Sequence, residues 1–144
     1  MATLNMYWYG RGVEAFKDGS VDWEADTIKV ALLDAAHTPD QGGDALFTDV
    51  SGDEISGSGY TAGGEDLTAK TLSYDAAGLH VTLDAADVSW DPSTITAQYA
   101  VIYKETGGQL IAYGDAGSEQ SSDNAAFTIE WNADGILRST AAAQ

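Results

Sequence analysis

The fold class is decided by the stretch Ile95-Thr96-Ala97-Gln98-Tyr99-Ala100-Val101-Ile102-Tyr103-Lys104, the longest segment of the chain with a two-residue hydrophobic period. Hydrophobic side chains recur at every second position, which is the spacing of one face of a β-strand and not that of a helix. The pair Gly107-Gly108 then supplies a tight turn, and a second apolar segment follows at residues 110–113. Together these features predict an antiparallel hairpin.

Shorter segments with the same period lie on both sides of this hairpin. Ile28, Val30 and Leu32 predict one face of a strand that Asp34 and Pro39 would end. Further strands are expected at residues 67–74, 79–83, 88–90, 127–131 and 136–137, with the last two joined by a turn at residues 132–135. About eight short strands with turns between them and no interleaved helices predict an all-β fold. The expected architecture is an antiparallel β-sandwich or a jelly-roll-like domain.

A short N-terminal helix is the expected exception to this pattern. Leu4, Trp8 and Phe16 lie near helical spacing within residues 4–17, and Asp18-Gly19 is a helix-ending pair. Glycines inside the segment weaken the helical pattern. We therefore expect a helix here, lying at the start of the β-domain.

The length of the chain, 144 residues, fits a single domain spanning residues 1–144. Within it, residues 1–20 form the N-terminal helical and docking segment. Residues 40–66 contain mostly Gly, Asp, Ser and Thr around a few apolar positions. This composition predicts a long loop excursion with at most one short strand, and long ordered loops are usually functional.

The net charge of the chain is extreme. The sequence holds 23 Asp and Glu against 6 Lys and Arg, which gives a formal charge of −17, while 44% of its residues are hydrophobic. The six cationic residues are scattered singly, so there is no basic patch to bind a phosphate backbone; this disfavours nucleic acid, and we expect no nucleic-acid partner. The hydrophobic content indicates a folded acidic protein and not a disordered acidic tail. Because salt shortens the Debye length to about 3 Å at ~1 M, the composition favours a high-salt habitat.

The sequence contains neither a candidate membrane-spanning segment nor a cysteine. No apolar run approaches the roughly 18 residues that a membrane-spanning helix needs, and residues 1–10 lack the basic start of a signal peptide. The chain contains no cysteine, which excludes disulfides and thiolate metal sites. We expect a protein that packs its core without cross-links and does not act on a membrane.

Catalytic motifs are missing from the local sequence. The two histidines are His37, in a polar loop, and His80, the outward residue of a strand. The stretch Gly57-Ser58-Gly59 lacks the spacing of a nucleophile elbow and is interpreted as a flexible turn. We expect no catalytic residues, no cofactor and no enzymatic activity. A glycosidase site made of two carboxylates distant in the chain is the one alternative that the sequence leaves open.

Three carboxylates in the long excursion are weak candidates for a metal site. Asp49, Asp53 and Glu54 could gather around a calcium ion. Their spacing does not follow the alternating ligands of an EF-hand loop. A solvated loop is the favoured interpretation, so no metal site is predicted.

The aromatic segment Met6-Tyr7-Trp8-Tyr9 is the main candidate for an interface. Four large side chains in succession cannot all face one core in either a helix or a strand. Aromatic residues and Met are enriched in the cores of protein interfaces. These four residues are therefore predicted to contact a neighbouring subunit, the alternative being a helix that closes the open end of the sandwich.

Five segments carry a resemblance to known proteins: residues 27–34, 57–64, 96–104, 129–132 and 135–137. Taken together, they resemble a family of small virion structural proteins of tailed bacteriophages and haloarchaeal tailed viruses. They cover strands and turns along most of the chain, and so bear on the fold more than on an activity. Compared with the bacterial-virus pattern, this chain has far fewer Lys and far more Asp, which fits a haloarchaeal host.

The resemblance implies a non-enzymatic component of a virus particle. Such proteins resemble capsid decoration or turret components that assemble as homo-oligomers, a trimer among the expected states. The implied partners are other copies of the chain and the major capsid protein or other virion proteins, and the implied location is the virion. A tail, neck or baseplate component is the alternative within this class. A carbohydrate-binding module and a secreted halophilic hydrolase are the alternatives outside it.

Overall fold

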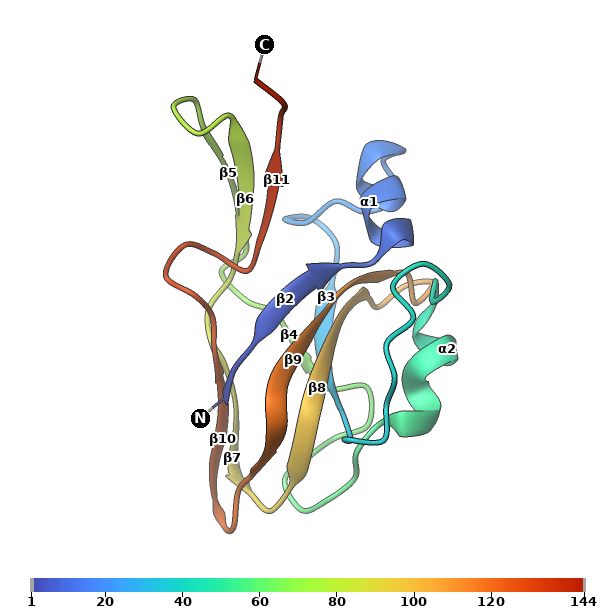
Figure 1. Cartoon of the computed structure of the whole chain (residues 1–144). Coiled ribbons are helices and arrows are strands. Elements are labelled where there is room, and N and C mark those ends of the chain that lie inside the picture. The colour runs from blue at the N-terminus through green and yellow to red at the C-terminus, as the bar shows by residue number, and fades with distance from the viewer. Residues whose placement is uncertain (1, 144) are drawn as a thin grey trace.

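The computed structural model describes residues 2–143 and shows a mostly β, sandwich-like fold. Within these residues three sheets are accompanied by one longer helix, α1 (Gly10–Lys17), and by the short turns α2 (Phe47–Val50) and η1 (Ser51–Asp53). Figure 1 shows two sheets forming the body of the molecule and a third projecting from it as an arm. The predicted all-β class with a short helix near the N-terminus is confirmed.

The central sheet contains the predicted hairpin. Its strand order is β2-β9-β8-β3-β4, with all neighbours antiparallel. The strands span β2 Asn5–Trp8, β9 Leu110–Ser121, β8 Thr96–Lys104, β3 Ile28–Leu33 and β4 Glu65–Asp66. Strands β8 and β9 are joined through Gly107 and Gly108, which both have positive φ angles (86° and 72°) that favour glycine.

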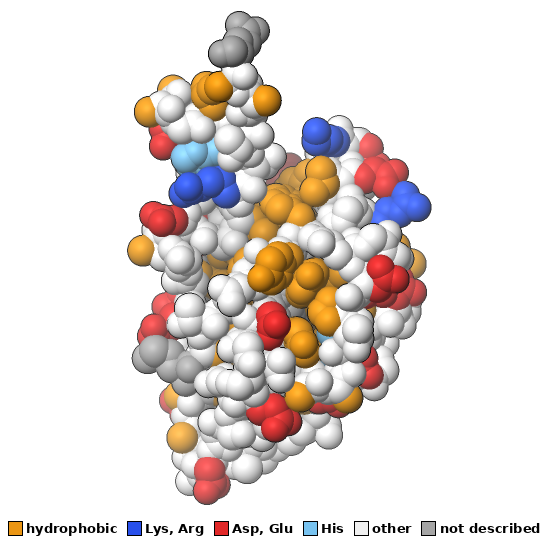
Figure 2. Space-filling view, viewed as in Figure 1, with side chains coloured by type: hydrophobic (Ala, Val, Ile, Leu, Met, Phe, Trp, Pro, Cys, Tyr) orange, Lys and Arg blue, Asp and Glu red, His pale blue; other side chains and the backbone are white. Residues whose placement is uncertain are grey.

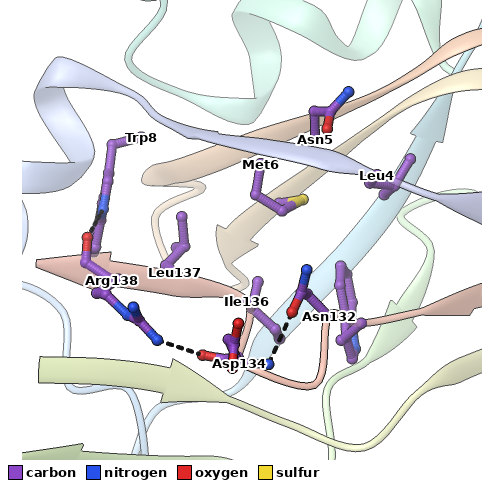
Figure 3. A pocket seen from close by; sticks show the side chains of 11 residues that line it. Leu4, Asn5, Met6, Trp8, Asn132, Asp134, Ile136, Leu137 and Arg138 are labelled. Carbon is purple, nitrogen blue, oxygen red and sulfur yellow. Dashed lines mark hydrogen bonds between the residues drawn. The ribbon is translucent and has the colours of Figure 1, made fainter. Parts of the chain in front are cut away.

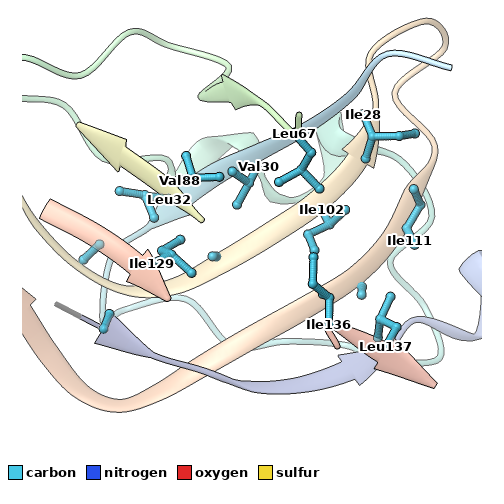
Figure 4. Packing of buried hydrophobic residues seen from close by; sticks show 14 of the residues in the cluster. Ile28, Val30, Leu32, Leu67, Val88, Ile102, Ile111, Ile129, Ile136 and Leu137 are labelled. Atoms are coloured by element: carbon cyan, nitrogen blue, oxygen red, sulfur yellow. The ribbon is translucent and has the colours of Figure 1, made fainter. Parts of the chain in front are cut away.

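A smaller sheet packs against one face of the central sheet. It has the order β1-β10-β7, with strands β1 Ala2–Thr3, β10 Ala125–Glu130 and β7 Val88–Ser93. Figure 4 shows the buried apolar side chains that fill the space between the two sheets; those labelled include Val30, Ile102 and Ile129. Aliphatic side chains from β3, β8 and β10 thus form the main hydrophobic core.

The outer face of the central sheet is also apolar. Ala31 and Leu33 of β3 and Val101 of β8 are fully buried there, in a second cluster separate from the main core. Residues 40–66 supply the cover: Phe47 stacks on Tyr103 with ring centroids 4.2 Å apart, and Val50 is 1% exposed. The predicted excursion is therefore an ordered lid on the sheet, built on α2 and η1, with β4 at its end.

The period-two run of β8 changes face partway along the strand. Ala97 lies in the main core, whereas Tyr99 and Val101 lie in or against the outer cluster. The pairing of β8 with β9 shifts register between Ala97 and Tyr99. A register irregularity of this kind breaks the strict alternation of faces, so the run is not the single face that its spacing suggests.

The N-terminal segment differs from the expected helix. Its first part forms strand β2, which pairs with β9 through registers such as Tyr7↔Tyr113, and the helix begins only at Gly10. A Cβ at Gly12 would overlap the Ile111 carbonyl, so the glycine lets α1 pack directly on β9. The helical expectation is wrong for residues 5–8 because β9 offers them an unpaired edge.

The third sheet forms an arm that projects from the body (Figure 1). Its order is β11-β6-β5, with strands β11 Leu137–Thr140, β6 His80–Asp84 and β5 Thr71–Asp75. The turn at residues 132–135 leads from β10 into β11, and Gly135 there has a φ of 99°. Residues 141–143 continue beyond β11 at the free end of the arm, where the Ala141 amide donates a hydrogen bond to the Leu79 carbonyl (Figure 1).

Glu54 fixes the lid to the edge of the central sheet. One of its carboxylate oxygens accepts a hydrogen bond from the Tyr60 hydroxyl at 2.7 Å and another from the Gly63 amide at 2.6 Å. The same Tyr60 hydroxyl accepts a bond from the Leu32 amide at 3.0 Å. Burial raises the pKa of Tyr60 above its usual range, and the nearby Glu54 raises it further, so the hydroxyl remains a donor.

The Tyr60→Phe variant is expected to be less stable by about 1–3 kcal/mol, because it removes a hydrogen bond to a carboxylate and leaves the Leu32 amide without its partner. Thermal or urea unfolding followed by circular dichroism measures this change. The matched control is Tyr74→Phe, since Tyr74 is 65% exposed on the arm. Equal stability of the two variants would contradict the role of this hydrogen-bond network.

Candidate functional site

An apolar groove lies between the arm and helix α1. It has a volume of about 400 Å³, and its apolar lining comprises Trp8, Val13, Phe16, Leu72, Val81 and Leu83. Figure 2 shows hydrophobic side chains exposed in the hollow between the projecting arm and α1 and continuing onto the body. A concave apolar surface of this size on so acidic a protein is a candidate binding surface.

Trp8 of β2 forms the boundary between this groove and a second hollow. Its indole N–H donates a hydrogen bond of 3.1 Å to the carbonyl of Arg138 in β11, and its ring packs edge-on against Phe16 at a centroid distance of 5.4 Å. The second hollow, with a volume of about 410 Å³, is lined by Met6 and Leu137 among others. Figure 3 shows the Trp8–Arg138 hydrogen bond beside this hollow. Trp8 therefore ties the arm to the body.

The rim of the groove is cationic, in contrast to the rest of the surface. Lys17, in the last turn of α1, and Arg138, on β11, both line it. Within residues 2–143 neither takes part in an ion pair, whereas Lys29 and Lys104 are paired with carboxylates. Figure 2 shows cationic side chains on the arm and on α1, on either side of the hydrophobic surface. A partner carrying carboxylates would meet opposite charge here.

The arm itself exposes large apolar side chains. Leu72 is 46%, Tyr74 65% and Leu79 36% exposed. Leu72 and Tyr74 lie opposite Leu83 and Val81 of β6, so these four residues share the apolar face that borders the groove. Residues of β5 are exposed along its whole length. The arm is thus an unpartnered apolar surface continuous with the groove.

The end of the hairpin β5–β6 has a defined turn. The carboxylate of Asp75 accepts hydrogen bonds from the amides of Ala77 and Gly78 at 2.9 and 3.3 Å. These bonds, with smaller contributions from the charges of His80 and Arg138, hold the pKa of Asp75 below its usual range. The turn therefore keeps its negative charge and its shape at neutral and mildly acidic pH.

The predicted interface segment is divided between several environments. As alternate residues of strand β2, Met6 and Trp8 are partly buried against the main core, and Tyr7 faces the outer side with 45% exposure. Tyr9 is fully buried in the outer cluster, so its predicted role as an interface residue is corrected: it has no surface to offer in the folded chain. For Met6, Tyr7 and Trp8 an interface role stays a prediction.

Tyr7 belongs to a small tyrosine patch on the outer face of the central sheet. Its ring stacks on Tyr113 at a centroid distance of 5.2 Å, and Tyr113 in turn contacts Tyr9 at 5.1 Å. Burial raises the pKa of Tyr113, so its hydroxyl remains protonated. Tyr7 itself stays 45% exposed, which makes it a second exposed apolar position.

His37 is buried instead of lying in an open polar loop. Its Nδ1 lies 2.8 Å from a carboxylate oxygen of Asp53, and its ring packs edge-on against Tyr99 at 5.5 Å. The other ring nitrogen, Nε2, is buried without a hydrogen-bond partner in the structure. A general base must reach the proton that it removes, and this imidazole is enclosed. The His37–Asp53 pair instead connects the turn after β3 to η1.

The second histidine, His80 on β6, is also largely covered, and its ring lies 3.7 Å from the Asp75 carboxylate.

The three carboxylates considered for a metal ion have separate partners. Asp49 accepts hydrogen bonds from the amides of Ala45 and Leu46 at the start of α2. Asp53 faces His37, and Glu54 binds Tyr60 as described above. Among residues 2–143 no group of three or more His, Asp or Glu side chains is placed to hold a metal ion. These carboxylates therefore act within the lid.

The arm residues Leu72 and Tyr74 are the main elements that sequence reasoning missed. Their signal was visible as two large apolar residues at alternate positions of Thr71-Leu72-Ser73-Tyr74-Asp75. That pattern predicts a strand with one apolar face. It does not say whether another element covers the face, and here part of it stays exposed.

Comparisons of the chain with models of protein families, with curated proteins and with solved structures find no significant match. Within the described residues no helix is long and apolar enough to cross a membrane.

The Trp8→Phe variant is expected to loosen the arm, because it removes the hydrogen bond to the Arg138 carbonyl, a loss of about 0.5–1.5 kcal/mol. Amide hydrogen exchange should rise in β5, β6 and β11 while β3 and β8 stay protected. The matched control is Trp131→Phe, which removes an indole bond of 3.0 Å to Ala86 instead. If amide exchange in the Trp8→Phe variant rose equally in all strands, β3 and β8 included, Trp8 would stabilise the whole fold and not the arm in particular.

Proposed function

We propose that this protein is a non-catalytic building block of the particle of a haloarchaeal tailed virus, acting as a capsid decoration or turret component. The observation that carries the proposal is the concentration of exposed apolar surface in the groove and the arm of a chain whose charge is −17. Soluble monomers rarely display large connected apolar surfaces without a partner. The family resemblance of the sequence supplies the virion setting.

The division of the molecule into body and arm supports a mechanism based on binding. The central sheet is covered by apolar packing on both faces and provides a rigid body. The groove, the arm and the tyrosine patch around Tyr7 are available for contacts with neighbouring subunits. Contacts of this kind need no chemical step. The acidic remainder of the surface keeps assembled particles soluble in concentrated salt.

The position within the virion has one alternative of the same class. A tail, neck or baseplate component would use the same docking surfaces in a different assembly. Both positions require homo-oligomers and contacts with other virion proteins. They differ in the partner, which for a decoration protein is the major capsid protein.

The tyrosine patch favours a second candidate function, that of a carbohydrate-binding module. Tyr7 is exposed at the surface beside Tyr113, and aromatic rings on β-sandwiches can stack on sugars. Titration with soluble glycans, read by tyrosine fluorescence and repeated with Tyr7→Ser, separates this candidate from a structural role. A saturable response that Tyr7→Ser abolishes would favour the module.

The virion proposal predicts that the chain is a stoichiometric component of purified particles and that deletion of its gene removes density from their surface. Mass spectrometry and electron microscopy of the particles measure both. Complementation with Tyr7→Ser and with Leu46→Ser tests the tyrosine patch and the lid separately, because the two side chains have similar exposure (45% and 42%). Absence of the chain from particles that carry their full set of proteins would overturn the proposal.

The charge of the chain predicts a strong dependence of stability on salt. The unfolding midpoint should rise steeply between about 0.1 M and about 3 M KCl, because screening weakens the repulsion among the carboxylates. Thermal denaturation in KCl and, as a control for ion-specific effects, in NaCl measures it. An unchanged midpoint over this range would contradict the halophilic interpretation.

A further inference from the structure

Strand β5 is a free sheet edge without the features that normally protect such edges. It lies at the end of the order β11-β6-β5, and all five of its residues are exposed. Edge strands of monomeric proteins are usually blunted by Lys, Pro or a β-bulge. The stretch Thr71-Leu72-Ser73-Tyr74-Asp75 has neither residue, and its pairing with β6 is regular throughout. Its outward backbone groups are available to another strand.

The sequence of β5 is complementary to itself in the antiparallel direction. When two copies pair with Ser73 opposite Ser73, Leu72 of each copy lies opposite Tyr74 of the other. Both side chains lie on the apolar face of the arm, so each strand would bury its exposed aliphatic residue against an aromatic one. This register uses all five residues, a length of about 17 Å.

The charges of β5 also favour this pairing. Residues 71–74 carry no carboxylate on a chain of charge −17, so the strand is among the surfaces with the weakest self-repulsion. In the Ser73-centred register Asp75 lies opposite Thr71 and not opposite the second Asp75.

We propose that β5 pairs antiparallel with β5 of a second copy of this chain, forming a continuous six-stranded sheet across a two-fold axis through Ser73. The axis is perpendicular to the sheet, so the apolar faces of both arms lie on the same side and the two grooves become continuous. Backbone hydrogen bonds join the two β5 strands, and the contacts between Leu72 of one copy and Tyr74 of the other set their register. A contact of this type is isologous and closes with two copies.

The β5–β5 pairing would be one of the contacts between subunits in the proposed assembly, and it rests on that proposed function. An isologous pair leaves the tyrosine patch around Tyr7 free. A trimer, or attachment to a capsid, would therefore use a different surface of the body. The arm contact can be tested with the purified chain alone, whereas the virion role requires particles, so each can fail without the other.

The test uses the absence of cysteine from the chain, which makes a single introduced thiol unambiguous. Ser73→Cys should form a disulfide-linked dimer under mild oxidation in concentrated KCl, because directly opposed residues of antiparallel strands have Cα atoms about 4.5–5.5 Å apart. Ser139→Cys is the matched control, since Ser139 is exposed on the opposite edge of the same arm. It should not form a disulfide-linked dimer, because in the proposed pairing the two Ser139 residues lie far from the β5–β5 contact.

A second substitution tests the register. Leu72→Lys in the Ser73→Cys background should lower the dimer yield about tenfold or more, because it places a charge against the partner's Tyr74. Circular dichroism checks that this variant folds, and sedimentation of the unmodified chain should show a dimer. Equal cross-linking of Ser73→Cys and Ser139→Cys, or a monomer in sedimentation, would overturn the proposal. In particles that carry the Ser73→Cys variant, cross-linking only to a different virion protein would also overturn the β5–β5 contact, while leaving the virion role intact.

Discussion

The structure depends on one constraint, the burial of the central sheet on both faces. In β3 the side chains of Val30 and Leu32 enter the main core, while Ala31 and Leu33 enter the outer cluster. A strand of this kind cannot leave either face in water without exposing several aliphatic side chains, each worth about 1.5–3 kcal/mol when buried. The sheet therefore needs two covers. Strands β7 and β10 provide one, and the segment at residues 40–66 provides the other.

This requirement explains why a segment rich in Gly, Asp and Ser is ordered. The lid contributes few apolar residues, chiefly Phe47 and Val50, so polar bonds must hold the remainder in place. The Glu54 carboxylate and the Tyr60 hydroxyl do so by bonding to each other and to backbone amides of the lid and of β3. The His37–Asp53 pair fixes a second point of the same segment. The carboxylates that resembled metal ligands in the sequence are thus part of the lid's attachment.

The sequence could predict the elements whose signal is local. The period-two segments, the Gly107-Gly108 turn and the turn at residues 132–135 depend on neighbouring residues only, and the corresponding strands are present. The strand at residues 5–8 was not predictable in the same way, because it exists through its pairing with β9. Likewise, no local pattern reveals the change of face after Ala97. Whether Leu72 and Tyr74 are covered is a property of the whole fold, so the candidate docking surface could be recognised only in three dimensions.

The charge and the exposed apolar surfaces have opposite effects on self-association, and salt decides between them. At low ionic strength the repulsion between two chains of charge −17 extends over about 10 Å and more, which opposes any contact. In concentrated salt the repulsion is confined to a few ångströms, while apolar association is not weakened by screening. The groove, whose lining includes the cations Lys17 and Arg138, and the uncharged residues 71–74 of β5 oppose contact less than a carboxylate-rich surface does. In the proposed assembly, contacts through the groove and β5 would give a subunit of charge −17 a defined orientation.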